Sequence, residues 1–399
     1  MNMINREEIN ELLADLIKIP SPYFEEEAIM EFAQKWLRER NVPVKIHRYH
    51  EKAITDFRGI NLTGVIDSGK VGPTVYFNGH LDTVKLCNGW TVPPYDAVVK
   101  DGHMYGLGAL DMKCGCAIIM NVLAEFKKNI SEFSGKIIYH LVSDEEGPFG
   151  LGTTYLINDR EIEKADIAIV TEPSAGFAGV QSPSISLGAR GGYNYTIKLY
   201  GKSSHAAMPE LGINALVDAS KIACELEKIK MITDDKLISG SHCLINIKGG
   251  GAACSVPDYA ELEVFRHIVR SENRDTIEKE VKEAIGKADI SGSYKLEFRS
   301  SPAENFDGGF MPYIVDENNE YVKALKSSIR KIFKKEATTT YFTSMGDFNH
   351  IGAKLGIPTI IFGPDGNNYH SYDEHVNLES TWETAESIYD FLVNILDAK

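Results

Sequence analysis

The sequence lacks the features that would direct a chain to a membrane or to nucleic acid. It contains no apolar run of about eighteen residues, so no transmembrane helix is predicted. Lys and Arg total 42 against 57 Asp and Glu, and the resulting net charge of −15 disfavours binding to a phosphate backbone. The first residues are charged and do not form the apolar core of a signal peptide. We therefore expect a cytoplasmic protein that acts on small molecules.

Cysteine pairs, repeats and biased segments are also missing. Only six cysteines occur among 399 residues, without a C-x-x-C pair or the close spacing of small disulfide-rich domains. We expect them to be reduced thiols. No internal repeat or low-complexity tract is present, which excludes a solenoid architecture. A chain of this length can instead bury a sizeable core and form two domains.

The first part of the chain alternates between helical and strand patterns. Helices are predicted at Asn5–Ile19, Glu25–Arg40, Cys116–Phe126 and Gly152–Asn158, and strands at Val42–His47, Ile60–Val65, Thr74–Phe77, Lys136–Val142 and Ile167–Val170. Strands such as KIIYHLV (136–142) are apolar throughout, which is typical of a sheet covered by helices on both faces. The pattern predicts an α/β fold, in which ligands bind beyond the carboxyl ends of the strands.

The character changes after about residue 182. Successive elements are predicted at Ser186–Leu199 (strand), Asn214–Ile229 (helix), Cys243–Lys248 and Ala260–Ile268 (strands), Thr276–Lys287 (helix) and Tyr294–Arg299 (strand). The order β-α-β-β-α-β is that of a ferredoxin-like unit. Helix and strand patterns then resume at Glu317–Phe333, Leu355–Phe362 and Leu378–Leu396. We therefore expect one domain made of residues 1–182 and 300–399, and an inserted domain at 183–299.

Polar side chains follow several of the predicted strands. They are His80, Asp82, Asp111, Glu145, Glu146, Glu172 and, near the C-terminus, His370. Two imidazoles and several carboxylates, with no cysteine among them, suit one or two zinc ions or similar metals. Taken alone, the H-x-D pattern is compatible with a structural histidine, and the pair Glu145-Glu146 with a solvated acidic turn. A solvated acidic turn is less expected here, because Glu145 and Glu146 directly follow the buried strand predicted at 136–142.

Six motifs in order carry a resemblance to a known family. They are GHLDTV (79–84), GLGALDMK (106–113), DEEG (144–147), TEP (171–173), GKSSHAAMP (201–209) and YHSYDEHV (369–376). Together they resemble the zinc metallohydrolase family of acetylornithine deacetylase, succinyl-diaminopimelate desuccinylase, aminoacylase and related carboxypeptidases and dipeptidases. The resemblance spans nearly the whole chain. It implies a catalytic domain with a mixed sheet, and it implies that the insertion is a lid and dimerisation domain of a homodimer.

The resemblance also implies roles for individual residues. Asp111 would bridge two metal ions, His80 and Glu172 would complete one site, and His370 and Glu146 the other. Glu145 would be the general base, and Asp82 would hold the His80 imidazole. His205 would stabilise the oxyanion in the partner's active site, and Arg266 would bind a substrate carboxylate, with a structural ion pair as the alternative for Arg266. Zinc is the expected metal, with cobalt and manganese as alternatives.

Departures from the family pattern leave the ligands and the base intact. They include Cys114, Cys254, Phe265 and Met345, of which Cys254 and Phe265 change the surface expected to contact substrate. The predicted activity is hydrolysis of an N-acyl amino acid, because a glutamate at position 172 resembles the deacylase and carboxypeptidase branches. A dipeptidase, aminopeptidase or carboxypeptidase using the same metals is the alternative. A non-catalytic binding protein is a further alternative, disfavoured because all seven positions are intact.

Overall fold

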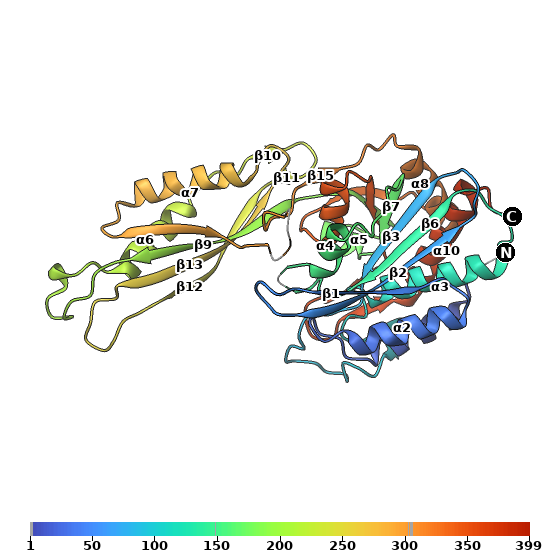
Figure 1. The fold of residues 1–399 in the computed structure, drawn as a ribbon, viewed down its shortest axis with the longest axis horizontal. Coiled ribbons are helices and arrows are strands. Elements are labelled where there is room, and N and C mark those ends of the chain that lie inside the picture. Colours follow the sequence, from blue (N-terminus) through green and yellow to red (C-terminus); the bar gives the residue numbers. More distant parts are fainter. Residues whose placement is uncertain (1–2, 148, 302, 304–305) are drawn as a thin grey trace. The chain divides into compact units, whose positions relative to one another are not determined.

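The computed structural model describes residues 3–147, 149–301, 303 and 306–399. The chain forms two compact units. The first contains the chain up to Ala189 and from Ile314 onward, and the second contains Arg190–Ser301 and Phe306–Tyr313. From the sequence alone, the inserted domain is predicted to span residues 183–299. In Figure 1 the chain runs from the N-terminal helices to α8 (Glu320–Phe333) and α10 (Leu378–Ile395), which return beside strands from the first half of the sequence.

A mixed sheet forms the centre of the first unit. Its strands are β1 (Lys45–His50), β2 (Arg58–Asp67), β3 (Thr74–His80), β6 (Lys136–Val142), β7 (Ile167–Val170), β8 (Ser184–Ala189), β15 (Tyr313–Ile314), β16 (Thr338–Phe342) and β17 (Thr359–Ile361). The order is β1-β2-β6-β3-β7-β17-β8-β15, with β16 also paired to β8. Strands β6, β3, β7 and β17 run parallel to one another, whereas β1, β2 and β8 add antiparallel pairings. The predicted α/β fold with a mixed sheet is confirmed.

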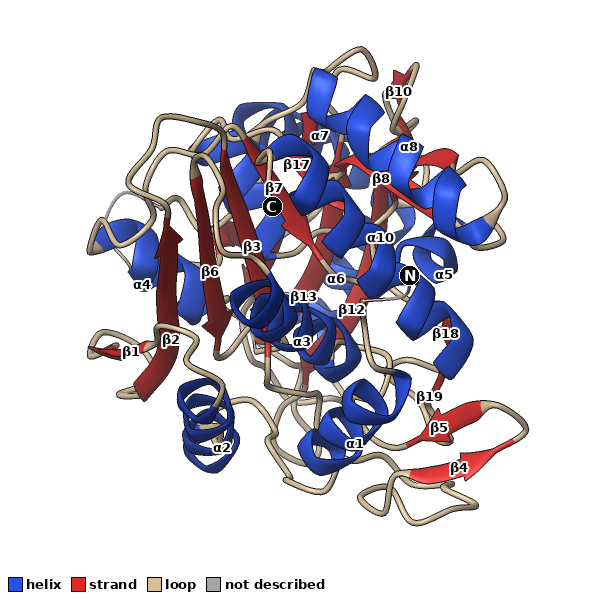
Figure 2. Ribbon diagram, turned by 90° about the vertical axis from the view of Figure 1, so that its right-hand side faces the viewer, coloured by secondary structure: helices blue, strands red, loops and turns tan. Residues whose placement is uncertain are grey.

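Helices cover both faces of this sheet. They are α1 (Arg6–Ile17), α2 (Glu27–Glu39), α3 (Lys113–Asn129), α4 (Leu151–Asn158), α5 (Ser174–Ala178), α8 (Glu320–Phe333), α9 (Asp347–Asn349) and α10 (Leu378–Ile395), with a π-helical turn at His350–Lys354. A Cβ on Gly79 would lie 3.0 Å from Cys116 Sγ of α3, whereas the neighbouring Asn78 donates to Thr153 of α4. Because successive strand side chains point to opposite faces, α3 and α4 lie on opposite sides of the sheet (Figure 2).

The structure differs from the prediction in the length of two strands. The segment Ser186–Leu199 forms two strands, β8 and β9 (Gly191–Tyr200), which belong to different units. The division follows from pairing: β8 bonds to β16 and β17, whereas β9 bonds to β13 (Tyr259–Ile268) and β14 (Ser293–Phe298). Strand β8 is buried throughout, and β9 alternates between buried and partly exposed residues. Similarly, only Thr359–Ile361 of the predicted strand Leu355–Phe362 pairs with the sheet.

A small second sheet in the first unit was not predicted. Its strands are β18 (Gly366–Asn367), β19 (His375–Asn377), β5 (His103–Tyr105) and β4 (Val98–Lys100), in that order. Strands of two or three residues are too short for an apolar periodicity to be visible in the sequence. The pairing of β19 with β5 brings the chain around residue 370 beside the chain around residue 106.

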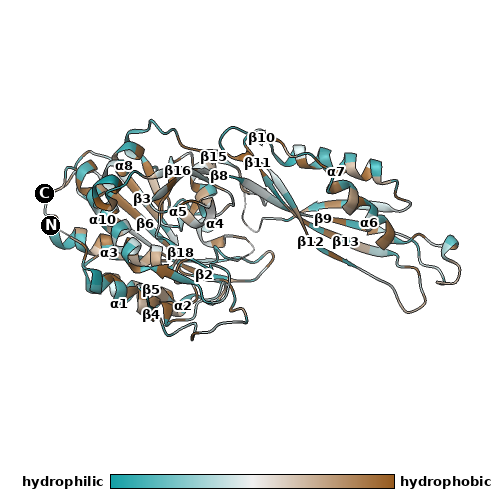
Figure 3. Cartoon of the chain, turned by 180° about the vertical axis from the view of Figure 1, so that it is seen from behind, coloured by the Kyte–Doolittle hydropathy of each residue, from teal (hydrophilic) through white to brown (hydrophobic). Residues whose placement is uncertain are grey.

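The second unit has a four-stranded antiparallel sheet with two helices. Its elements are β9, α6 (Ala215–Leu226), β12 (Ser241–Gly249), β13 (Tyr259–Ile268), α7 (Arg274–Ala288) and β14 (Ser293–Phe298), with a short ladder of β10 (Thr233–Asp234) and β11 (Ile238–Ser239) and a 3-10 turn at Pro209–Leu211. The strand order is β12-β13-β9-β14. Apolar residues from α6, α7 and the sheet form its core. In Figure 3, α7 alternates between hydrophilic and hydrophobic residues, as expected for a helix with one face on a sheet. No helix within the described residues is long and apolar enough to cross a membrane.

Candidate active site

Three neighbouring strands of the large sheet end at the same edge and carry polar residues there. His80 is the last residue of β3, and it pairs with Val142 at the end of the parallel strand β6. Glu145 and Glu146 follow β6, and Glu172 follows β7, which lies on the other side of β3. This arrangement follows from the parallel order β6-β3-β7, because parallel strands present their carboxyl ends together.

Two further residues reach this edge on loops. Asp111 lies just before α3, and His370 lies between β18 and β19 of the small sheet. Glu374 joins the two loops: its buried carboxylate accepts hydrogen bonds from the backbone N–H groups of Gly108, Leu110 and Asp111 at 2.8–2.9 Å. Glu374 itself lies in the segment between β18 and β19, so these bonds connect the His370 loop to the Asp111 loop.

Replacing Glu374 tests this support. In Glu374→Gln one amide oxygen must serve three N–H donors, and the amide N–H₂ group faces a donor. We expect a loss of about 2–3 kcal/mol in the free energy of unfolding, measured by urea denaturation, because buried donors without an acceptor each cost about that much. Glu379→Gln, at an exposed position on α10, is the control. An unchanged unfolding midpoint would contradict a supporting role.

Asp111 lies between the two imidazoles. Its Oδ1 is 3.4 Å from His80 Nε2, and its Oδ2 is 3.4 Å from His370 Nε2. Glu172 Oε1 lies 3.2 Å from His80 Nε2, and Glu146 Oε1 lies 2.8 Å from His370 Nε2. The structure therefore brings all five predicted ligands together as two groups that share one aspartate.

The polar atoms of this cluster fit a pair of divalent cations. His80 Nε2 and Glu172 Oε2 are buried and have no hydrogen-bond partner among the described residues. His80 Nδ1 lies 3.1 Å from the backbone oxygen of Asp82, which places the proton on Nδ1 and leaves the Nε2 lone pair facing the carboxylates. Ligand atoms of His80, Asp111 and Glu146 lie within 4.8 Å of one another. Imidazole nitrogens with carboxylate oxygens are a donor set that zinc and related metals accept.

Burial and mutual repulsion change the acidity of the carboxyl groups. Burial, followed by the charge of Asp111, raises the pKa of Glu146 to about 7 and that of Glu172 to about 8. Burial also raises the pKa of Glu145 well above its usual value. Although burial opposes it, Asp111 and Glu146 raise the pKa of His370 to about 11. Without cations, the cluster therefore retains protons that offset its negative charge.

The raised pKa values of Glu146 and Glu172 predict how the stability of the metal-free protein depends on pH. A carboxyl group whose pKa is raised on folding stabilises the fold fully below its unfolded pKa of 4.5, and that contribution is lost as the pH rises through the folded pKa. We expect the free energy of unfolding of the chelated protein to fall from about pH 5 to pH 8, by on the order of 1.4 kcal/mol per pH unit for each group. Urea unfolding with and without chelator should show a metal-dependent gap that widens over this range. A constant gap would contradict the prediction.

Glu145 and the turn that carries it are held by neighbouring groups. Its Oε1 accepts the Asp347 N–H at 3.2 Å, and its Oε2 lies 4.0 Å from His80 Nε2. The Asp82 carboxylate accepts the N–H groups of Glu145 and Glu146 at 3.2 and 2.9 Å. We expected the carboxylate of Asp82 to orient His80. In the structure the Asp82 carboxylate lies 3.6 Å from His80 Nδ1 and accepts hydrogen bonds from the turn, whereas the ring N–H donates to the Asp82 carbonyl oxygen.

Sequence reasoning missed a buried hydrogen-bond chain behind Glu145. Thr153 donates to the carboxylate of Asp347, Asn78 donates to Thr153 and to Tyr76, and the Tyr76 hydroxyl lies 3.0 Å from His140 Nδ1. Asp347 lies two residues after Met345, one of the departures from the family pattern, and His140 lies outside the six motifs. No spacing in the sequence links these positions, since they meet only through the pairing of β3 with β6 and the packing of α4.

The remaining two predicted residues lie in the second unit. His205 is exposed, and its Nδ1 accepts the N–H of Ala207 at 3.1 Å, which leaves Nε2–H as a donor. Arg266 is buried, and its guanidinium contacts Glu272 and lies 2.9 Å from Glu280. The structure therefore favours the ion pair that was the alternative for Arg266. A substrate carboxylate would have to compete with both glutamates.

The fold and the cluster together define a metal-dependent hydrolase. Strand ends of a mixed sheet and two loops bring together two histidines and three carboxylates, with a further glutamate beside them. Residues 76–394 match the model of peptidase family M20/M25/M40, and the chain belongs to that family. The resemblance inferred from the six motifs is thereby confirmed.

Individual relatives cover nearly the whole chain. A succinyl-diaminopimelate desuccinylase from Sulfurimonas denitrificans is 29% identical over 394 residues, covering 97% of this chain and 98% of the relative. A tripeptidase structure from Staphylococcus aureus has a TM-score of 0.78 at 22% identity and covers 98% of this chain and 99% of its own. A Bacillus subtilis structure, described as a dinuclear metal binding peptidase of family M20, has a TM-score of 0.70 at 14% identity, with 99% of each chain covered. These two structures share the fold of this protein.

Proposed function

We propose that this protein hydrolyses the amide bond of an N-acyl amino acid. The observation that carries the proposal is the placing of Asp111 between the Nε2 atoms of His80 and His370, with the Glu145 carboxylate beside them. A carboxylate between two imidazoles can bridge a pair of metal ions, and such pairs stabilise the attacking and leaving oxygens in hydrolysis. The desuccinylase name of the Sulfurimonas denitrificans relative supports an acylated amino acid as substrate.

Two zinc ions are the cofactors that we propose, with cobalt or manganese as alternatives. His80, Asp111 and Glu172 would hold one, and His370, Asp111 and Glu146 the other. When bound, such cations polarise the substrate carbonyl and make a water molecule more acidic. Three ligand carboxylates would nearly neutralise the charge of the pair.

Glu145 is the proposed general base. Its carboxylate takes a proton from the attacking water and returns it to the nitrogen of the departing amine. The Asp347 N–H and the contact of Asp82 with the turn hold this carboxylate in place. Position matters because proton transfer requires the base to be within hydrogen-bond reach of the water.

His205 is proposed to donate a hydrogen bond to the developing oxyanion of a partner subunit's substrate. Its Nε2–H is available, since Nδ1 is occupied by the Ala207 N–H. This role requires a homodimer formed through the second unit, which we also propose. Strand β12 is an edge strand of that unit with exposed Ile245 and Ile247, which makes it suited to pairing with a second copy.

Subunit mixing tests the role of His205. We expect His205→Ala to lower kcat by on the order of 100-fold with metal content unchanged, as loss of an oxyanion donor does. Mixing it with Glu145→Gln should restore part of the activity, because one of the two sites in a mixed dimer then has both residues. His103→Ala, at a half-buried histidine of β5 in the small sheet, is the control. Absence of rescue in a verified mixed dimer would show that His205 does not act across subunits.

The substrate class is tested by comparing the turnover of acylated amino acids with the turnover of dipeptides. Purified protein is assayed with N-succinyl and N-acetyl amino acids and with dipeptides, each with a chelator control. Turnover of the acylated amino acids supports the deacylase. Turnover of dipeptides alone would replace it with the peptidase alternative.

We also infer a cytoplasmic location, since all six cysteines are free thiols.

A further inference from the structure

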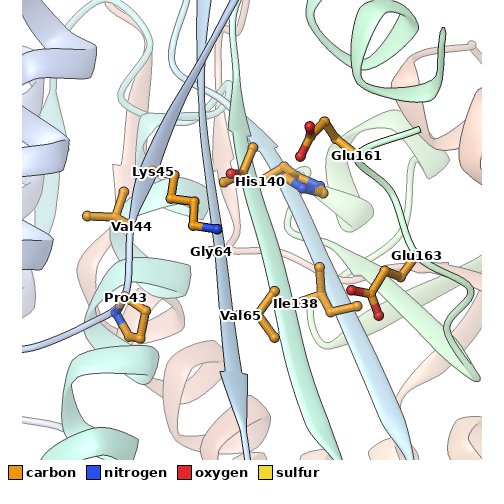
Figure 4. Close-up of a pocket in the computed structure, with 10 residues that line it drawn as sticks. Pro43, Val44, Lys45, Gly64, Val65, Ile138, His140, Glu161 and Glu163 are labelled. Atoms are coloured by element: carbon orange, nitrogen blue, oxygen red, sulfur yellow. The ribbon is translucent and has the colours of Figure 1, made fainter. Parts of the chain in front are cut away.

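A second cavity lies on the sheet face that carries α4. Its volume is about 490 Å³, and none of its lining residues belongs to the metal cluster. Lining residues come from β1 and the two residues before it, from β2, from β6 and from the segment after α4, all within the first unit (Figure 4). A cavity of this size is in the range of small-molecule sites.

One wall of the cavity is a row of hydrogen-bond donors across three strands. Lys45 of β1 pairs with Thr63 of β2, and Thr63 pairs with His140 of β6. Directly opposed residues of antiparallel strands point to the same face, so the three side chains lie side by side. Within the described part of the chain, the Lys45 ammonium, the Thr63 hydroxyl and His140 Nε2 have no hydrogen-bond partner.

The tautomer of His140 makes it a donor toward the cavity. Tyr76, which is fully buried, accepts a hydrogen bond from Asn78, so its own proton needs an acceptor. The only other described partner of the Tyr76 hydroxyl is His140 Nδ1 at 3.0 Å. Burial lowers the pKa of His140 to about 3, so the ring is neutral. Its proton is therefore on Nε2, the nitrogen left free to bind a molecule in the cavity.

The segment after α4 brings the complementary charge to the cavity lining. Glu161 has no ion-pair partner among the described residues, whereas the neighbouring Glu163 is bound to Lys136 at 3.4 Å. Figure 4 shows Lys45 and Glu161 on separate segments around one space, with Val65 and Ile138 along it. The cavity thus offers donors for a carboxylate, a carboxylate for an ammonium group, and an apolar surface near both.

We propose that this cavity is a second binding site, for a free amino acid with an apolar side chain. The amino acid's carboxylate binds the row of Lys45, Thr63 and His140, and its ammonium group binds Glu161. Its side chain packs on Val65 and Ile138. The site is independent of the proposed hydrolytic function, because neither the metals nor Glu145 take part in it.

The probe is L-leucine, titrated into the metal-loaded protein by calorimetry. We expect a dissociation constant in the millimolar range, about 4 kcal/mol of binding free energy. Isopentylamine lacks the carboxylate, and 4-methylpentanoate lacks the ammonium group. Each is expected to bind at least about tenfold more weakly than L-leucine, since each loses one charged contact.

Single substitutions test whether L-leucine binds in this cavity. Lys45→Met and Glu161→Gln change exposed side chains and should weaken L-leucine binding about tenfold or more. Val65→Trp, at a position 37% exposed, should fill the cavity and abolish binding. Lys70→Met and Glu132→Gln remove one member each of an exposed ion pair outside the cavity and should leave binding unchanged. Binding that survives Val65→Trp, equal binding of the two analogues and L-leucine, or no binding up to about 20 mM would overturn the proposal.

Discussion

Glu145→Gln is expected to lower kcat by at least about 100-fold while metal content stays the same. General-base catalysis contributes about 10²–10⁴-fold, and an amide cannot take the proton from water. The substitution keeps the side-chain oxygen that accepts the Asp347 N–H, so the turn should remain in place. The measurements are steady-state kinetics and metal analysis of the purified variant.

Glu132→Gln is the matched control for this change, because it makes the same substitution at an exposed position. Its kcat should equal that of the unmodified protein. A Glu145→Gln variant with nearly normal turnover would rule out Glu145 as the base. Retained metal binding without any detectable substrate turnover in the unmodified protein would instead favour the non-catalytic alternative.

Asp111→Asn is expected to have an effect of similar or larger size, by a different route. The two oxygens of Asp111 face two different imidazoles, each at 3.4 Å, and an amide has only one oxygen to offer. The variant should hold fewer metal ions per chain than the unmodified protein. Its turnover should fall by on the order of 1000-fold, because a metal contact supplies several kcal/mol of transition-state stabilisation.

Metal analysis after dialysis and kinetics with added zinc test this prediction. Asp101→Asn, at an exposed turn of the small sheet, is the control with the same chemical change. Full metal content in Asp111→Asn would show that Asp111 does not bridge two ions. Complete recovery of turnover in excess zinc would show that its role is only to increase affinity.

Much of the site was predictable because its parts follow buried strands. KIIYHLV (136–142) is apolar throughout, so Glu145 and Glu146 had to emerge where that strand leaves the core. The same reasoning applies to His80 after β3 and Glu172 after β7. The large helices and most central strands were predicted for the same reason, since their apolar periodicity spans many residues.

Other features required contacts between distant segments. The small sheet that carries the His370 loop has strands of two or three residues, which leave no pattern. The division between β8 and β9 depends on which strands they pair with, since only the single residue Arg190 separates them in the sequence. From the sequence, Arg266 can be interpreted equally well as a substrate ligand or as an ion-pair partner. The structure distinguishes the two because it places Glu272 and Glu280 beside the guanidinium.

The amino-acid sequence by itself determined the α/β class, the family and the set of side chains with metal-binding chemistry, because these depend on residue type, local periodicity and short motifs. Tertiary structure alone decided which oxygen faces which nitrogen. It assigned the Asp82 carboxylate to the Glu145–Glu146 turn and joined His140 to Asp347 through Tyr76, Asn78 and Thr153. The physical reason is that a hydrogen bond acts over about 3 Å, whereas these partners are brought within that distance only by strand pairing and helix packing.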